Sequence, residues 1–420
     1  MTEATKTTAR RVKEEGGRDA TLLENGTTRI LIGDKGGMVP ELSVRKENGF
    51  LNAHWHPVFR SNSGEVFDRA RHGDFWKVEL LYELAGNFPC VPNFGGGHRD
   101  GTIDHLPHGW SANLAWKHGA AGVDEKTGAA WALSAMESPE ATLPLFFRKI
   151  DAVVPGENVH YSSLAVENRG NAAAEINIGW HNTIGSPFLQ AGCRLSACAE
   201  RWATPPLGGE FDDTGRLAID AEFESLERAP TRDGKTCDLS FVPGPIGFTD
   251  FATGPVPPSV ATGWSAVSNP ALGLVYACFF PGPPTAGDDG IALSFNDLWM
   301  QYGGRRFRPW AAWDGGTDRV FCLGTENATG AFANGLAFSK GRRSVLGSPT
   351  IVTIPPRSTR TLRYGTLFAP YSDGSLDGGV LGIDGGKGLL VLKGAGKEER
   401  FSADPSFAAL RSLEGRSQEK

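Results

Sequence analysis

Apolar and polar residues alternate in short runs along most of this chain. Residues 160–168 show the alternation well, and a turn follows at 167–171. A period of two is typical of β-strands with one buried face. Similar runs predict further strands at 27–32, 39–44, 129–136, 144–150, 173–180, 263–268, 273–280, 292–295, 320–324, 336–338, 350–354 and 361–368.

Helical periodicity is rare. Residues 406–413 form the only clear short helix, 61–74 have room for another, and 75–84 fit a helix or a strand equally well. Stretches rich in Pro, Gly and Asp predict long loops at 190–260 and 281–290. No βαβ alternation occurs, which argues against a parallel nucleotide-binding sheet.

We therefore predict an all-β fold, a large antiparallel β-sandwich with few short helices. A single domain is expected over residues 21–400. Residues 1–20 are expected to be a disordered or loosely docked tail, and residues 401–420 a short helix with a charged tail.

Composition narrows the function. Hydrophobic residues make up 40% of the 420 positions, enough for a large core, and the net charge is −6 without a basic stripe. Nucleic acid and anionic membranes are therefore not expected as partners. The chain has no secretory signal, no apolar run near the ~20 residues of a membrane span, and six cysteines in no disulfide framework. We expect a soluble cytoplasmic monomer or homodimer.

Residues 85–116 form the most distinctive stretch of the chain. It is too rich in Pro and Gly for a helix or a central strand, yet it carries His98, His105 and His108 and two tryptophans. A rigid loop with polar and aromatic side chains is typical of one wall of a small-molecule site. Residues 179–182 and 323–327 are expected to form other walls.

Two strand ends offer acid–base groups. His181 ends an alternating run, where it is either a general acid or a structural histidine that bonds the backbone. Glu326 ends an apolar run, where it is either a general base or a turn cap.

Residues 295–304 combine aromatic rings with amide and carboxylate groups. Sugars are bound in this way, because their C–H faces stack on Trp or Tyr while their hydroxyls pair with polar side chains. Asp297, Trp299 and Gln301 are therefore candidate sugar-binding residues, as are Asn93 and His105 in the 85–116 loop. The nearby Arg305, Arg306 and Arg308 are interpreted as a solvated face.

A metal site is the alternative chemistry for the histidines. His54 and His56 share one strand face, as in cupin-type centres, but the remaining histidines are scattered and no partner carboxylate stands out. Pro107 prevents His105 and His108 from forming a helical pair. We predict no metal ligands.

Three segments together resemble the aldose 1-epimerase (galactose mutarotase-like) superfamily. Residues 88–95, FPCVPNFG, and 107–116, PHGWSANLAW, are similar to the PxxFPxFG and HGFARNxxW motifs of its hexose-6-phosphate epimerase branch. Residues 36–42 resemble the family's first hairpin. His181 and the run 323–329 fall where the family has its second histidine and its catalytic Glu.

The resemblance implies a β-supersandwich enzyme that interconverts sugar anomers without a cofactor. It implies that His181 is the general acid to the ring oxygen, Glu326 the general base to the anomeric hydroxyl, and His108 a positioning partner. It further implies that His181 and Glu326 face each other across a cavity for one pyranose ring, with His108 on its rim. Ala112 and Phe88 replace two family arginines, which leaves the recognition of a sugar phosphate open.

Three alternatives remain open. One is a lyase with a Tyr302, His181 and Arg305 set on a related scaffold. The others are a non-catalytic sugar-binding protein and a cupin-like metalloenzyme that uses His54 and His56.

Overall fold

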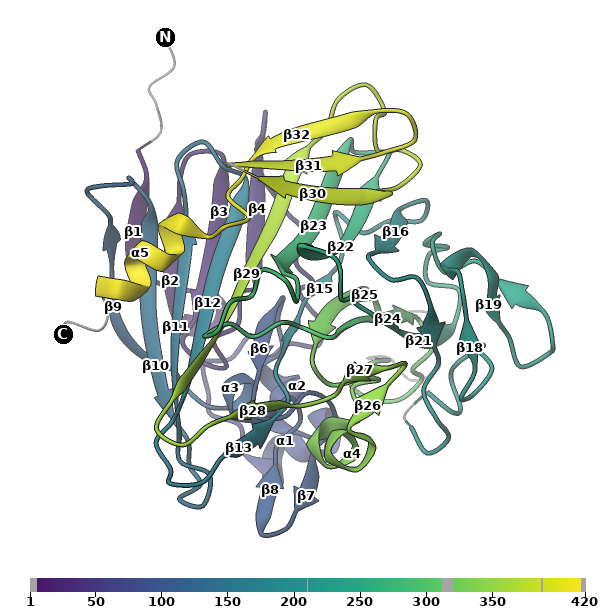
Figure 1. Ribbon diagram of the computed structural model, residues 1–420, viewed down its shortest axis with the longest axis horizontal. Helices are drawn as coiled ribbons and strands as arrows, with labels where there is room; N and C mark the ends of the chain where they lie inside the picture. Colours follow the sequence, from purple (N-terminus) through teal and green to yellow (C-terminus); the bar gives the residue numbers. More distant parts are fainter. Residues whose placement is uncertain (1–5, 210, 312–319, 387, 417–420) are drawn as a thin grey trace.

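Two large antiparallel sheets dominate the fold (Figure 1). The computed structural model describes residues 6–209, 211–311, 320–386 and 388–416. Sheet I has the order β16-β22-β23-β29-β12-β11-β10-β9. Its strands are β9 (Lys117–Val123), β10 (Ala130–Glu137), β11 (Leu145–Val153), β12 (Val159–Asn168), β16 (Arg194–Ala197), β22 (Thr262–Asn269), β23 (Leu274–Pro281) and β29 (Thr359–Pro370).

Sheet II has the order β18-β17-β21-β24-β25-β14-β6, and β15 also pairs with β25. Its strands are β6 (Phe88–Cys90), β14 (Gly179–His181), β15 (Thr183–Ile184), β17 (Trp202–Ala203), β18 (Glu222–Phe223), β21 (Phe248–Pro255), β24 (Phe295–Tyr302) and β25 (Phe321–Ala328). The all-β prediction is confirmed by these antiparallel sheets.

A third, five-stranded sheet contains β1 (Thr8–Lys13), β2 (Asp19–Glu24), β3 (Thr28–Gly33), β4 (Glu41–Lys46) and β5 (Gly49–Asn52). Its strands contact β9, β10 and β29 of sheet I. The expectation of a loosely docked tail is therefore wrong for residues 8–20. Their polar side chains resemble a solvated tail, but the backbone of β1 pairs with β2 along its whole length, and Arg11 forms an ion pair with Asp34 at 2.6 Å.

Small elements complete the fold. The helices are α1 (Arg69–Trp76), α2 (Glu79–Glu83), α3 (Gly109–Asn113), α4 (Gly335–Arg342) and α5 (Ala408–Arg416), with 3-10 turns at Glu15–Gly17 and Leu226–Arg228. The short strands are β7 (His98–Asp100), β8 (Ile103–His105), β13 (Ala174–Ile176), β19 (Ala229–Pro230), β20 (Thr236–Cys237), β26 (Ser344–Val345), β27 (Ser348–Pro349), β28 (Val352–Ile354), β30 (Gly382–Gly386), β31 (Leu389–Lys393) and β32 (Glu398–Ser402).

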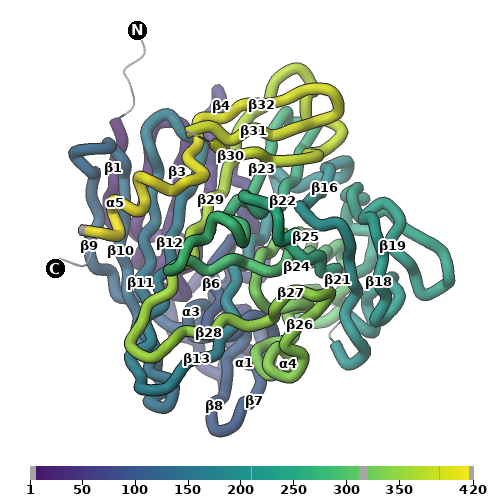
Figure 2. The backbone as a smooth tube through the Cα atoms, in the orientation of Figure 1, coloured from purple at the N-terminus to yellow at the C-terminus, as the bar shows by residue number. Residues whose placement is uncertain are grey.

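The space between sheets I and II is filled by aromatic side chains. Trp180 of β14 stacks on Tyr364 of β29 with ring centroids 5.4 Å apart, and Tyr364 also stacks on Phe280 of β23. All three are at most 1% exposed. Such face-to-face packing of two sheets is the core of a β-sandwich. Helices α1 and α4 and the β7–β8 hairpin gather at one end of the molecule (Figures 1 and 2).

The interior also contains charged groups. Lys149 is fully buried, lies 2.9 Å from Asp151 and donates to the Gly37 carbonyl at 2.9 Å. His160 contacts the other oxygen of Asp151 at 2.9 Å. Burial opposes ionisation of Asp151, but Lys149 and His160 hold the pKa of its carboxyl below the usual range.

Three regional predictions are wrong. Residues 336–338 belong to helix α4, and the strand expected at 292–295 begins only at Phe295 and continues to Tyr302. The segment 190–260 is not one long loop, because it contributes β16 to β21. Strand β21 is buried on both faces, so it lacks the alternation that marks a half-buried strand.

Helices are more numerous than the single clear helix expected near the C-terminus. That helix is present as α5, and the 61–84 region contains α1 and α2. Within the described ranges, no helix combines the length and apolar character that crossing a membrane requires.

Candidate functional site

A cavity of about 450 Å³, here called the central cavity, lies on the face of sheet II that points away from sheet I. Sheet II contributes its floor, and α2, the glycines at 95–97 and the loop after β24 contribute its walls. The lining side chains with chemical function are His98, His108, His181, Arg305, Glu326 and Asn334.

Strand alternation sends His181 and Glu326 into this cavity. Trp180 and Asn327 are cross-strand partners in β14 and β25, and Trp180 points towards sheet I. Because successive side chains of a strand point to opposite faces, His181 and Glu326 point the other way. The sequence neighbours of both residues thus anchor the strands inside the sandwich.

His181 and Glu326 lie side by side on one wall. The Nε2 atom of His181 is 3.5 Å from Oε1 of Glu326. The two groups therefore do not face each other across the width of a sugar ring, and the expectation that they do so is wrong. Adjacent strands bring them together, since β14 pairs directly with β25.

The His181 ring is held from two sides. Its Nδ1 lies 2.9 Å from the Thr183 hydroxyl, and its face stacks on Phe88 with centroids 4.6 Å apart. When the hydroxyl donates to Nδ1, the ring proton of the neutral imidazole is on Nε2, the nitrogen that faces Glu326.

The 85–116 loop delivers His108 to the same place. The residue has a left-handed backbone, φ 57°, immediately before α3. Gly109 follows with φ 78°, and a Cβ there would lie 2.3 Å from the Val91 carbonyl oxygen, so only glycine fits. The His108 ring contacts His181 edge-on at 4.7 Å, and its Nδ1 is 3.5 Å from the Cys90 thiol.

Burial makes both histidines poor bases. It lowers the pKa of His108 to about 4, with a further contribution from the positive charge of Arg305. It also lowers the pKa of His181 well below its usual value, assisted by His108 and Arg305.

Arg305 was wrongly interpreted as part of a solvated face. It is only 7% exposed and lines the cavity. Its guanidinium lies 4.1 Å from the Trp310 ring and 5.3 Å from the Trp299 ring. The aromatic residues around the RRFRPW segment were the signal for this position, because an arginine stacks readily on a tryptophan.

Trp299 also lines the cavity, but the other four expected sugar-binding residues do not. Asn93 is fully buried and joins two segments, since it accepts from the Leu336 amide at 2.8 Å and donates to the Leu106 carbonyl at 3.1 Å. His105 is 4% exposed and lies between the rings of His98 and Trp110.

Asp297 and Gln301 share a strand face with Trp299 but are fully buried. Asp297 accepts hydrogen bonds from the Thr253 hydroxyl and from the Phe332 amide. Burial raises the pKa of its carboxyl to about 8. Gln301 accepts from the Thr249 hydroxyl. Alternation correctly places these residues on one face of β24. Other segments of the chain cover Asp297 and Gln301, so only Trp299 of the three reaches the cavity.

Neither alternative residue set converges. Tyr302 lies in β24 on the face opposite to Trp299 and does not line the cavity with His181 and Arg305. His54 is buried, with its ring nitrogens 2.6 Å from the Val39 carbonyl and 3.1 Å from the Tyr276 hydroxyl, whereas the side chain of His56 is 43% exposed. Among the described residues, no group of three His, Cys, Asp or Glu could hold a metal ion.

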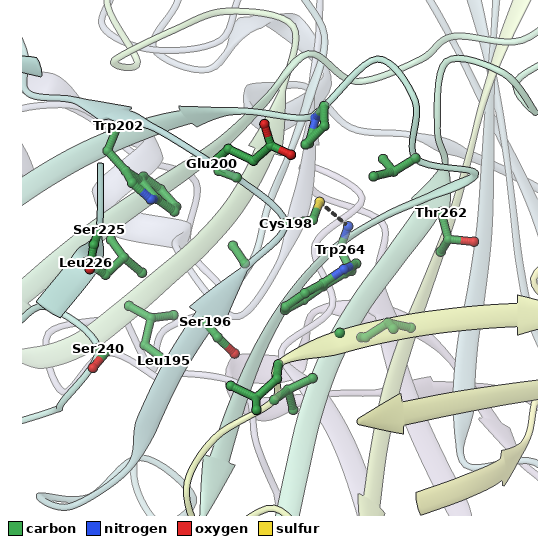
Figure 3. A pocket seen from close by; sticks show the side chains of 18 of the residues that line it. Leu195, Ser196, Cys198, Glu200, Trp202, Ser225, Leu226, Ser240, Thr262 and Trp264 are labelled. Atoms are coloured by element: carbon green, nitrogen blue, oxygen red, sulfur yellow. Dashed lines mark hydrogen bonds between the residues drawn. The ribbon is translucent and has the colours of Figure 1, made fainter. Parts of the chain in front are cut away.

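A larger cavity of about 660 Å³ lies beside β16, β22 and β30, with Trp202 and Trp264 in its lining (Figure 3). Its carboxylates, which belong to Glu200, Glu224, Glu227 and Asp384, are all exposed. Among the described residues, no histidine lines it. The central cavity is the better candidate, because a buried imidazole and a buried carboxylate lie together in its lining.

No protein-family model matches this sequence, and no curated protein sequence matches it either. Known structures do resemble it. A candidate aldose 1-epimerase from Klebsiella pneumoniae superposes with a TM-score of 0.62 at 13% identity, covering 87% of this chain and 84% of that chain. A galactose mutarotase-like protein from Clostridium acetobutylicum gives 0.58 at 11% identity, covering 87% and 99%.

A candidate aldose 1-epimerase from Escherichia coli K12 gives a TM-score of 0.51 at 13% identity, covering 87% of this chain and all of that one. At identities this low, structural similarity indicates a shared architecture but not a shared chemistry. The three superpositions show that this chain shares the overall fold of these structures.

Proposed function

We propose that this protein is an aldose 1-epimerase-like enzyme that interconverts the anomers of a free sugar or sugar derivative. The observation that carries the proposal is the contact of 3.5 Å between His181 and Glu326 in a cavity with aromatic walls. A buried imidazole beside a buried carboxylate provides one proton donor and one proton acceptor.

Anomer exchange needs these two groups and no cofactor. Glu326 removes the proton from the hydroxyl on C1, the C1–O5 bond breaks as C1=O forms, and His181 gives a proton to O5. Rotation about C1–C2 exposes the other face of the aldehyde. The O5 hydroxyl then attacks C1, its proton returns to His181, and Glu326 returns a proton to O1.

The side-by-side placement of the pair suits this reaction. The two oxygens that exchange protons, O1 and O5, are bonded to the same carbon, so donor and acceptor must approach one small region of the substrate. Burial disfavours the protonated form of His181, and two interacting groups share their protons as a pair. The reactive form of the pair carries one proton, with imidazolium facing carboxylate.

The other lining residues orient the sugar. His108 lies against His181 and is positioned to contact a hydroxyl next to the anomeric centre. Trp299 offers a ring whose face can stack on the C–H side of a pyranose. His181 also contacts the Trp299 ring at 5.8 Å, which places the stacking surface beside the acid–base pair.

Saturation-transfer NMR on a panel of free aldoses tests the proposal. The wild-type protein should accelerate exchange between the two anomeric signals beyond the spontaneous rate. His181→Ala and Glu326→Gln should each lower the enzymatic rate by about 10²–10⁴-fold. The exposed His56 and Glu200 provide matched controls, because His56→Ala and Glu200→Gln make the same changes outside the cavity.

Rates that stay unchanged in both cavity variants would refute the assignment. Stabilisation by a sugar without any anomer exchange would indicate a sugar-binding protein instead.

A further inference from the structure

The central cavity has two chemically different walls. His108, His181 and Glu326 form the acid–base wall. Helix α2 and its flanking residues form a wall of aliphatic side chains, which is completed by two aromatic residues in tilted contact, with ring centroids 5.0 Å apart. The members of this apolar wall are Val78, Leu80, Leu81, Leu84, Phe211 and Phe251.

A plain sugar does not match the apolar wall. Every hydroxyl that leaves water needs a new hydrogen-bond partner, and an unpaired buried hydroxyl is costly. The side chains of valine, leucine and phenylalanine have no donor or acceptor. A pyranose can use the ring of Trp299 and the groups around Glu326, but among the described residues its hydroxyls find no side-chain partner on the α2 side.

Apolar residues also continue to the mouth of the cavity. Phe307 lines it and is 56% exposed. Phe307 therefore adds an exposed apolar side chain to the lining of the cavity. The volume of about 450 Å³ falls in the range of pockets that hold ligands larger than one sugar ring.

From these two walls we infer that the natural substrate is an aldose that carries an apolar substituent, such as an aryl or acyl group. The sugar ring occupies the acid–base wall, and the substituent occupies the apolar wall. This inference rests on the proposed function. Because the reaction removes a proton from the hydroxyl on C1, the substituent is attached elsewhere on the sugar, which excludes glycosides as substrates.

Benzoyl esters of common aldoses are suitable probes. D-Glucose and D-galactose are each compared with their 4-O-benzoyl and 6-O-benzoyl esters, since both positions lead away from C1. Spontaneous exchange is subtracted for every compound. We expect kcat/KM of at least one ester to exceed that of its parent sugar by about tenfold or more, because an apolar group gains that much in an apolar pocket.

A polar substitution in the apolar wall should reverse this preference. Leu81 is partly exposed, so Leu81→Ser is expected to fold. It should lower the ester-to-parent ratio of kcat/KM by about tenfold. Leu381, which is 67% exposed beside the larger cavity, provides the matched control. Leu381→Ser should leave the ratio unchanged.

The outcomes separate the two proposals. Exchange of the parent sugars without any gain for the esters refutes the apolar substituent but leaves the epimerase assignment in place. An ester preference that survives Leu81→Ser refutes the role of the α2 wall. Absence of exchange with every compound refutes the proposed function and this inference with it.

Discussion

Asn182 and Asn327 bind the same hydroxyl group, that of Tyr364. Asn182 donates to it from Nδ2 at 2.5 Å, and the hydroxyl donates to Oδ1 of Asn327. Each asparagine is the sequence neighbour of one acid–base residue, His181 or Glu326. A side chain of sheet I therefore joins the two strands of sheet II that carry the proposed catalytic pair.

Tyr364→Phe should lower kcat with little effect on KM. The change keeps the stacking on Trp180 but removes the hydroxyl that bridges Asn182 and Asn327. Two buried amides then lose a hydrogen-bond partner, which costs about 1–3 kcal/mol of free energy. The loss should loosen the 3.5 Å contact of His181 with Glu326. Steady-state kinetics should show a decrease in kcat of about tenfold or more.

The control for this prediction is Tyr371→Phe, which removes a surface hydroxyl bonded to Asp377. It should leave kcat unchanged. If Tyr364→Phe lowers the thermal stability but leaves kcat unchanged, the bridge has a structural role only.

Arg305→Met should shift the pH dependence of activity towards higher pH. Burial is the main cause of the low pKa of both histidines, and His108 adds to the effect at His181. The positive charge of Arg305 lowers both pKa values further. Its removal raises these pKa values. Because His181 must carry a proton to donate it, the activity that is lost as pH rises should be lost at a higher pH.

The pH profile of kcat/KM and the imidazole NMR signals measure this shift. Arg306→Met is the control, since Arg306 is exposed and neighbours Arg305 in the sequence. The same displacement in both variants would refute the electrostatic explanation.

His105→Phe should stabilise the protein, most strongly in acid. Neither ring nitrogen of His105 has a hydrogen-bond partner within the described part of the chain, and burial lowers its pKa to about 4. The unfolded chain therefore binds a proton that the folded protein rejects between pH 6.5 and 4, so the wild type loses stability as pH falls through this window.

Denaturant unfolding at several pH values tests the prediction. The difference between His105→Phe and the wild type should grow by about 1.4 kcal/mol for each unit of decreasing pH in that window. Parallel curves for the two proteins would mean that His105 is charged in the fold.

Asp151→Asn should destabilise the protein by about 3–5 kcal/mol, because it leaves the fully buried Lys149 without its carboxylate. The double substitution Lys149→Met with Asp151→Leu should recover most of this loss, since it removes both charges together. Unfolding midpoints measure both effects. A single variant as stable as the wild type would contradict the charge balance described for this pair.

Much of the sandwich could be predicted from alternation alone, because strands such as β10 have one buried face and one partly exposed face. Strand β21 could not, since both of its faces are buried. Strand β1 could not either, because its polar residues pair through the backbone and its apolar content is low.

The same limit applies to the site. His181 ends β14, as the sequence indicates, whereas Glu326, which was expected at a strand end, lies within β25. Asp297 and Gln301 alternate with Trp299, but coverage by other segments decides which of the three reaches the cavity. Helix α2 approaches from a segment whose pattern fitted a helix or a strand, so its aliphatic wall had no signal in the sequence.

The alternation of β14 and β25 separates the side chains that line the cavity from those that hold the two strands in place. In enzyme engineering, these two roles are often changed together. His181 and Glu326 line the central cavity, whereas their immediate neighbours, Asn182 and Asn327, bind the Tyr364 hydroxyl inside the sandwich. Variant libraries directed at the apolar wall could therefore change substrate selectivity without disturbing the hydrogen bonds of Tyr364 with Asn182 and Asn327. Substitutions at Tyr364 could tune turnover in a protein whose choice of sugar is unchanged.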